Sequence, residues 1–200
     1  MTMFEMELAS RGGAPLFQPF HILKALWCVQ QAEIIGRKEL SAKLAIGEGS
    51  TRKLITYLEE KEWATCTRQG ISLTNSSKNL LNSIGILAKE VKVGDLTVNE
   101  KNFAIRLSGV SNLIGKGIEQ RDEAMKVGAS GASTLIFSEG LKFSDDYEAS
   151  SVDKEASKRI MEIFQPLDGD IIIIGSASEL IMAEDGAFSA AVLTLANKKL

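Results

Sequence analysis

The sequence predicts an α+β protein. A mainly helical first domain with a short β-hairpin is followed by a small α/β sandwich domain with a mixed or mostly antiparallel sheet. Apolar residues between Leu16 and Ile34 recur at steps of mostly three and four, the spacing of a helix with one buried face. After Trp63 the pattern changes to that of short strands around a tight turn. Near the end of the chain, the segment 170–174 is apolar after its first residue, as expected of a strand buried on both faces.

Length and composition narrow the class of protein. The chain has 200 residues, 44% hydrophobic and 24% charged, which is enough for one sizeable core or two small ones and excludes disorder. No uncharged apolar stretch approaches the roughly 18 residues that a membrane span requires. Glu5 and Glu7 precede every Lys and Arg, the reverse of a secretory signal. We therefore expect a soluble, cytoplasmic protein without a membrane partner.

Charge divides the chain into parts. Residues 15–88 hold nine Lys and Arg against six Asp and Glu, whereas residues 89–200 hold 13 against 18. We therefore expect an N-terminal tail over 1–14, a first domain over 15–88 and a second domain over 89–200. The mildly basic first domain is the part expected to meet a polyanion.

Three helices are expected at the start of the first domain. The first runs from Leu16 to Ile34, and the second occupies Arg37–Ile46 after the break at Gly36. Gly47–Gly49 reads as a tight connection, and Ser50 or Gly49 is expected to cap a third helix over Thr51–Lys61. Two short helices joined by a glycine-rich turn of three or four residues indicate a helix-turn-helix.

The third helix has side chains that suit a DNA surface. Arg can bond to a guanine edge or a phosphate, Lys neutralises phosphates, and hydroxyls at a helix start bond to the DNA backbone. The exposed faces are expected to carry Thr51, Arg52, Lys53, Thr56 and Tyr57. Acidic Glu59, Glu60 and Glu62 come at the far end, which is compatible with binding because bases are read by the N-terminal residues of this helix.

A hairpin and a fourth helix complete the first domain. The strands are expected at Ala64–Thr67 and Ile71–Leu73, with Arg68 at the tip of the turn. A hairpin in this position is expected to be a wing, whose tip in winged-helix proteins commonly touches a phosphate or the minor groove. Thr74 or Asn75 is expected to open the last helix, which continues to about Ala88.

The runs GEGSTRKLITYLEEKEW (47–63) and ISLTNSSKNLL (71–81) resemble the winged helix-turn-helix domains of prokaryotic transcription regulators. The resemblance covers residues 20–82 and departs from the family at Glu62, where a glycine is often found. It implies binding to double-stranded DNA. The expected DNA-binding residues are Lys38, Lys43, Ser50, Thr51, Arg52, Lys53, Thr56, Arg68 and Gln69.

The second half is expected to follow the order β-β-α-β-β-α-β-α. The strands are expected at 91–93, 103–107, 133–137, just after the turn at 139–140, and 170–174, with helices at 112–127, 152–164 and 179–195. A mixed or mostly antiparallel sheet fits better than a doubly wound sheet because helices and strands do not alternate strictly.

The phrases RDEAMKVGASGASTLIF and GDIIIIGSASELIMAEDGAFSAAVLTL, together with the winged helix, resemble archaeal winged-helix proteins whose C-terminal domain has no assigned function. Between the last strand and the last helix, Gly175, Ser176 and Ser178 form a corner where free N–H groups of a helix start could hold a ligand. Ordinary helix capping by Ser178 explains the corner as well, and the pattern is not a P-loop.

The remaining candidates favour structural roles. His21 is expected on a helix face, Cys28 and Cys66 as small buried thiols, and Gly115–Gly117 inside the helix that packs on the sheet. The acidic residues of segment 145–155 lack the spacing of a calcium loop and are expected to be solvated. We therefore expect no enzyme activity, no catalytic residue, no metal and no cofactor.

Together these patterns predict a DNA-binding transcription regulator that acts as a homodimer on two half-sites about one helical turn apart. The C-terminal domain is expected to dimerise, to sense a small-molecule effector, or both. The alternative is a winged-helix module that joins a protein assembly without binding DNA.

Overall fold

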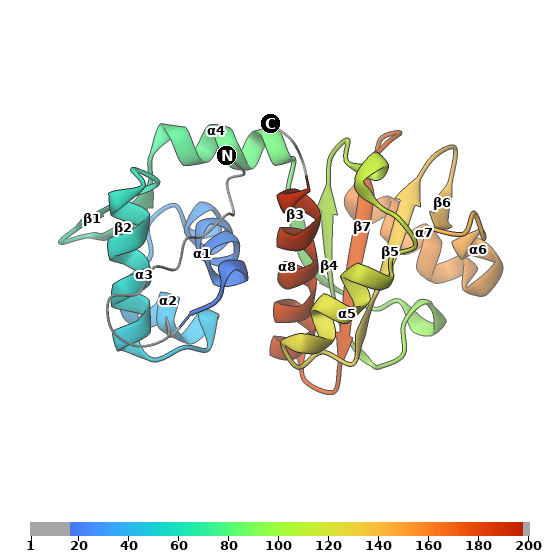
Figure 1. Ribbon diagram of the computed structural model, residues 1–200, viewed down its shortest axis with the longest axis horizontal. Helices are drawn as coiled ribbons and strands as arrows, with labels where there is room; N and C mark the ends of the chain where they lie inside the picture. The colour runs from blue at the N-terminus through green and yellow to red at the C-terminus, as the bar shows by residue number, and fades with distance from the viewer. Residues whose placement is uncertain (1–16, 198–200) are drawn as a thin grey trace. The chain divides into compact units, whose positions relative to one another are not determined.

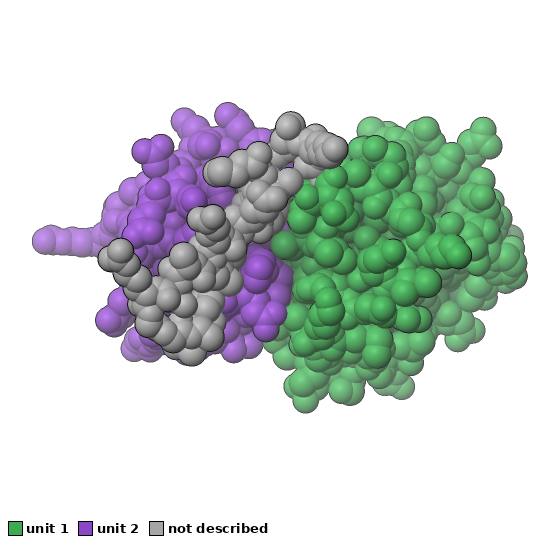
Figure 2. Space-filling view, viewed as in Figure 1, with its two compact units in different colours: residues 1–4, 85–200 green, residues 5–84 purple. Residues whose placement is uncertain are grey.

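The computed structural model describes residues 17–197 and divides them into two compact units, one ending at Ile84 and the other beginning at Gly85 (Figure 2). Leu16, the expected start of the first helix, and the expected tail over 1–14 lie outside the described residues. No helix within 17–197 is long and apolar enough to cross a membrane.

The first unit contains the expected helices and hairpin (Figure 1). Its elements are α1 (Pro19–Ala32), α2 (Arg37–Leu44), α3 (Glu48–Glu60), β1 (Ala64–Thr67), β2 (Gly70–Leu73) and α4 (Asn75–Ile84). The apolar stripes of the helices meet in one core, where Leu23, Leu40 and Leu54 are fully buried. The predicted helical fold of this unit is confirmed, and the fourth helix ends at Ile84 rather than at Ala88.

The turn between α2 and α3 lies earlier than predicted. Ala45 ends α2 in the left-handed conformation, with φ of 52°, and Gly47 is the N-cap of α3 in extended conformation. Gly49 is therefore helical, and neither Gly49 nor Ser50 caps the helix. The turn was predicted at Gly47 and Gly49 because glycine usually occupies the left-handed position that ends a helix. Here Ala45 adopts that conformation instead.

The end of α3 is a Schellman motif with a glutamate in the glycine position. Trp63 N donates to Leu58 O (2.8 Å) and Glu62 N donates to Glu59 O (2.9 Å), the two bonds that define the motif. Glu62 accordingly has a left-handed φ of 57°. This geometry is consistent with the glycine that is often found at the position in the family that the sequence resembles.

Replacing Glu62 with glycine is expected to stabilise the first unit by about 0.5–1 kcal/mol, because glycine adopts the left-handed conformation without a Cβ clash. Urea unfolding followed by tryptophan fluorescence measures the change, since Trp27 and Trp63 both belong to this unit. Lys61→Gly is the matched control: φ is −83° at Lys61, so glycine there should destabilise. An equal loss in both variants would contradict the argument.

The second unit is built on a five-stranded sheet in the order β3-β4-β7-β5-β6, with every neighbouring pair antiparallel. The mostly antiparallel alternative is therefore confirmed. The strands are β3 (Leu87–Val91), β4 (Lys101–Leu107), β5 (Gly131–Phe137), β6 (Leu141–Phe143) and β7 (Ile171–Ala177). The helices are α5 (Ile118–Lys126), α6 (Ala149–Val152), α7 (Lys154–Phe164) and α8 (Leu180–Ala196).

The sheet lies between two helical layers (Figure 1). Every residue of the central strand β7 is buried, as the apolar run predicts. Ile172 and Ile174 pack with α6 and α7, where Ile160 is fully buried. On the other face α8 packs against β7 and β4, with the rings of Phe103 and Phe188 6.0 Å apart, and α5 packs against β5.

Two predicted helices of this unit begin later than expected. The helix expected over 112–127 starts only at Ile118, because Gly117 is its N-cap with φ of 71°. Gly115–Gly117 therefore precedes the helix instead of lying inside it. Asp153 caps α7 by accepting a hydrogen bond from Ala156 N (2.9 Å), which separates it from the single turn of α6.

Candidate nucleic-acid interface

The exposed side of α3 begins with two cations. Arg52, Lys53 and Thr56 are exposed, whereas Leu54 and Leu58, one helical turn apart, are fully buried in the core. The amphipathic pattern thus turns three of the predicted DNA-binding side chains toward solvent. The N-cap of α3 makes no side-chain hydrogen bond, so the backbone N–H groups of its first turn also have no side-chain acceptor there.

Two other predicted contacts, Ser50 and Thr51, are buried. Thr51 is fully buried and its hydroxyl donates to Gly47 O (3.1 Å), while Ser50 is 7% exposed. These side chains hold the start of α3 against the core. They do not share the exposed surface of Arg52 and Lys53.

Tyr57 was expected on an exposed face of α3 and is half-buried. Its ring centroid lies 6.3 Å from that of Trp63 and 6.4 Å from that of Phe17, and the Lys61 ammonium stands 5.7 Å from it. Burial raises the pKa of the Tyr57 hydroxyl above its ordinary value. Its position anchors α3 to the chain segments on either side.

Helix α2 adds exposed Lys38 and Lys43. Arg37, at the start of the same helix, lies 3.7 Å from the Glu48 carboxylate at the start of α3. Both partners are about half exposed, so the pair contributes little stability.

The hairpin of β1 and β2, the predicted wing, is held by the chain between α1 and α2. Ile35 forms a bridge with Ile71, exchanging both backbone hydrogen bonds, so the chain between α1 and α2 extends the hairpin. The Thr67 hydroxyl accepts a hydrogen bond from Gln69 N (3.2 Å) and fixes the turn. Arg68 and Gln69 are exposed at the tip of the hairpin, which extends away from the helices in Figure 1.

The acidic end of α3 supports the wing. The Glu59 carboxylate accepts a hydrogen bond from Cys66 N in β1 (3.1 Å). Cys28 is buried as expected, but Cys66 is exposed because β1 buries only its first residue, Ala64. Glu59 therefore has a structural partner at the end of the helix opposite to Arg52.

The predicted corner after β7 does not assemble a site. Gly175 and Ser176 are buried residues of β7, and the Ser176 hydroxyl donates to Asn99 O (3.3 Å). Ser178 is exposed but does not cap α8, whose N-cap is Glu179 without a side-chain hydrogen bond. Ser178 therefore does not share the buried surroundings of the other two residues, and Gly175 lies against the backbone of α8.

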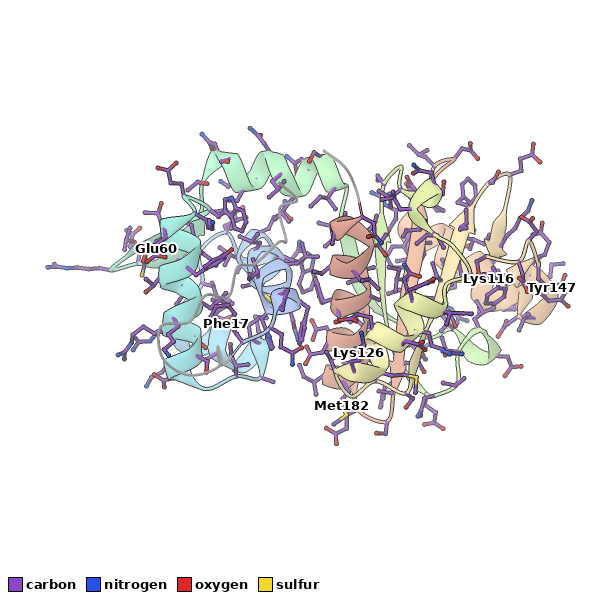
Figure 3. All side chains as sticks on the ribbon, viewed as in Figure 1. Phe17, Glu60, Lys116, Lys126, Tyr147 and Met182 are labelled. Atoms are coloured by element: carbon purple, nitrogen blue, oxygen red, sulfur yellow. The ribbon has the colours of Figure 1, made fainter. Side chains whose placement is uncertain are left out.

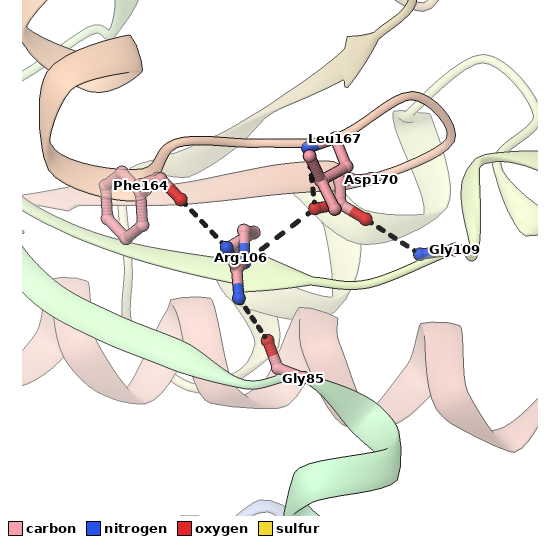
Figure 4. Close-up of polar contacts among 6 residues, drawn as sticks. All are labelled: Gly85, Arg106, Gly109, Phe164, Leu167 and Asp170. Carbon is pink, nitrogen blue, oxygen red and sulfur yellow. Dashed lines mark hydrogen bonds and ion pairs between the residues drawn. The ribbon is translucent and has the colours of Figure 1, made fainter.

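The structure also shows a buried ionic cluster that periodicity does not predict (Figure 4). Arg106 of β4 donates to Phe164 O (2.9 Å) and Gly85 O (3.2 Å), and lies 3.8 Å from the Asp170 carboxylate. Asp170 also accepts hydrogen bonds from Gly109 N and Leu167 N, both 3.0 Å. The available clue was an acidic residue at the head of an otherwise apolar buried strand.

His21 has a structural contact. Its Nδ1 accepts a hydrogen bond from Gln18 N (2.9 Å), and this reciprocal capping box begins α1. Among residues 17–197, no group of three or more His, Cys, Asp and Glu side chains is placed to hold a metal ion.

Comparison with known proteins matches the two units of the chain to two different families. Residues 17–87 match the family described as the CggR N-terminal DNA binding domain, and residues 98–195 match a domain of unknown function, DUF4443. The hypothetical protein PH0730 from Pyrococcus horikoshii OT3 is structurally similar, with a TM-score of 0.67 and 26% identity over 88% of this chain and 92% of that one. No curated protein matches the chain. These similarities support a DNA-binding domain in the first unit, followed by a DUF4443-like domain in the second.

Proposed function

We propose that this protein is a transcription regulator that binds duplex DNA through α3 and the wing. The observation that carries the proposal is the match of residues 17–87 to a DNA-binding domain, on a unit whose α3 exposes Arg52, Lys53 and Thr56. A side chain that forks onto a base edge and one that neutralises a phosphate thus stand side by side at the helix start.

The contacts divide into two classes. Arg52, Lys53 and Thr56 lie nearest the bases, because the N-terminal part of the second helix of a helix-turn-helix enters the major groove. The anchors on the phosphates are Lys38, Lys43, Arg68 and Gln69, from α2 and the wing. Ser50 and Thr51 are left out of the interface because their side chains are buried.

We expect the regulator to act as a homodimer, since one such domain reads only a short site and two half-sites about one helical turn apart double the contacts. In this proposal the second unit supplies dimerisation, effector sensing, or both, and the protein is a cytoplasmic regulator rather than an enzyme.

Fluorescence anisotropy with a random-sequence duplex tests DNA binding without knowledge of the operator. Affinity should fall linearly with salt on logarithmic axes, with a slope set by the number of phosphates neutralised. Absence of binding at low salt by the folded protein would refute the proposal and favour a winged-helix module that joins a protein assembly.

On a duplex selected for tight binding, the double variant Arg52→Ala with Lys53→Ala is expected to weaken binding at least about tenfold and to reduce the salt slope by about 1, because one base contact and one phosphate contact disappear. Anisotropy titrations at several salt concentrations measure both effects. Lys78→Ala is the matched control, since Lys78 is an exposed lysine of the same unit on α4. Equal affinity of the double variant and the parent would remove α3 from the interface.

A further inference from the structure

A cavity in the second unit opens beside the start of α5. Its volume is about 540 Å³, and it is lined by Lys116, Phe143, Ser144, Asp145 and Tyr147. Lys116 precedes α5, whereas the other four residues belong to the end of β6 and the loop after it. Figure 3 labels Lys116 and Tyr147 at this end of the unit. The volume suits a small metabolite rather than a single ion.

Two hydroxyls lie under the start of α5. Leu135 of β5 pairs with Phe143 of β6, so continuing this register places Thr134 opposite Ser144 on the face that α5 covers. Thr134 is only 5% exposed, and its hydroxyl has no hydrogen-bond partner among the described residues. A buried hydroxyl without a partner is unfavourable, and such exceptions in a folded protein call for an explanation.

The glycine at the helix start faces both hydroxyls. A Cβ at Gly117 would lie 3.4 Å from Ser144 Oγ and 3.8 Å from Thr134 Oγ1. Gly117 is the N-cap of α5, has φ of 71° and makes no side-chain cap. The first helical hydrogen bond runs from Arg121 N to Gly117 O, so the N–H groups of the preceding turn have no intrahelical acceptor.

The charges favour an oxyanion at this end of the cavity. The N-terminus of a helix carries a partial positive charge, and the neighbouring Lys116 is exposed and forms no ion pair with a described residue. Asp145 is the acidic member of the lining, and its Oδ1 accepts a hydrogen bond from Tyr147 N within its own loop (3.3 Å). Donors therefore gather around Gly117, although Asp145 follows Ser144 in the lining and Glu119 lies in the first turn of α5.

We propose that this cavity binds a small metabolite through an oxyanion, carboxylate or phosphate. Lys116 and the Ser144 hydroxyl, which line the cavity, hold the oxyanion together with the free N–H groups of α5. The Thr134 hydroxyl lies behind Gly117, outside the lining, and becomes a further donor if the ligand reaches past this glycine. The loop with Asp145 and Tyr147 contacts the rest of the molecule. This site deepens the proposed function by giving the regulator an effector pocket, which lies away from the predicted corner at Gly175. Binding to it is measurable without DNA.

The test is a thermal-unfolding titration of the full chain with inorganic phosphate and, separately, with acetate at matched ionic strength, using sodium chloride as the reference. A ligand that binds only the folded state raises the midpoint in a concentration-dependent way. Phosphate also stabilises proteins in general by exclusion from their surface, so the oxyanion that the site takes is identified by the part of the rise that the site variants lose. The proposal would be overturned if neither anion raised the midpoint at concentrations up to about 50 mM, which is about 50-fold above the Kd of a millimolar binder.

Three variants decide whether the effect arises at this cavity. Lys116→Ala and Thr134→Val should each weaken the anion-dependent shift at least about tenfold in apparent affinity, whereas Lys89→Ala, an exposed lysine of β3, should retain it. Thr134→Val should also unfold at a higher temperature than the parent without anion, because it removes an unpartnered hydroxyl at nearly constant volume. An unchanged anion response in both site variants would overturn the proposal. If the parent protein binds no DNA but still responds to the anion at this cavity, only the proposed DNA-binding function is refuted.

Discussion

Gly175→Ala is expected to destabilise the second unit by about 3 kcal/mol or more. Gly175 lies in the central strand β7, and a Cβ there would overlap the carbonyl oxygen of Ala183 and lie 2.8 Å from Ala187 N. Both are backbone atoms of α8, so no side chain can rotate away. Inserting one methyl group into a close-packed core costs about 1–3 kcal/mol, and more when backbone must move.

Unfolding in urea can separate the two units in this experiment. Far-UV circular dichroism reports both, whereas Trp27 and Trp63 report the first unit alone. The variant should lose or shift the transition of the second unit and leave the tryptophan transition in place. Gly115→Ala is the matched control, because the nearest atom to its added Cβ is a flexible Glu119 oxygen at 3.9 Å. Equal stability of Gly175→Ala and the parent would contradict the packing argument.

This role for Gly175 explains why the sequence pointed to a site that the structure does not form. A glycine between a buried strand and a helix start occurs in anion-binding corners, but it also occurs wherever a helix crosses a strand at close range. Gly186 repeats the packing use on α8, since its Cβ would lie 2.6 Å from Ala129 Cβ. Sequence alone does not state which surface a glycine faces, so the two uses could not be separated before the fold was known.

Periodicity predicted most of the elements because burial of one face dominates their energetics. The apolar stripe of α3, the alternation in β4 and the continuous run in β7 each placed an element within a few residues of its observed bounds. The errors gather at turns. Ala45 ends α2 in a left-handed conformation, and α5 begins at Ile118 after its N-cap Gly117 instead of at Asn112. Such boundaries are hard to predict because caps depend on single residues and not on a repeated pattern.

The candidate DNA-binding surface divides in the same way. Residue chemistry selected Arg52 and Lys53, which are exposed, together with Ser50 and Thr51, which are buried. The difference follows from helical periodicity: Thr51 lies three, four and seven residues before Leu54, Ile55 and Leu58, and therefore shares their buried face. The pocket beside Gly117 could not be predicted for a related reason: Thr134 and Ser144 are neighbours only through the pairing of β5 with β6.

The second large effect is expected at Asp170. Its carboxylate lies 3.8 Å from the Arg106 guanidinium and accepts two backbone N–H bonds, and only 4% of its side chain is exposed. Asp170→Ala would leave two N–H groups unsatisfied and a guanidinium without its counter-charge. Removing one partner of a buried pair costs about 3–5 kcal/mol, and the lower end applies here because the Arg106 side chain is 22% exposed.

A double-mutant cycle distinguishes this coupling from a simple loss of packing. Asp170→Ala, Arg106→Met and the double variant are unfolded in urea, again following circular dichroism against tryptophan fluorescence. Because Arg106→Met removes the stranded charge, the double variant should lose less stability than the sum of the two single variants, by about 1 kcal/mol or more. Additive losses would show that the cluster acts through its backbone hydrogen bonds alone. The ion pair would then add no stability beyond the two hydrogen bonds by which Arg106 connects Gly85, where the second unit begins, to Phe164 at the end of α7.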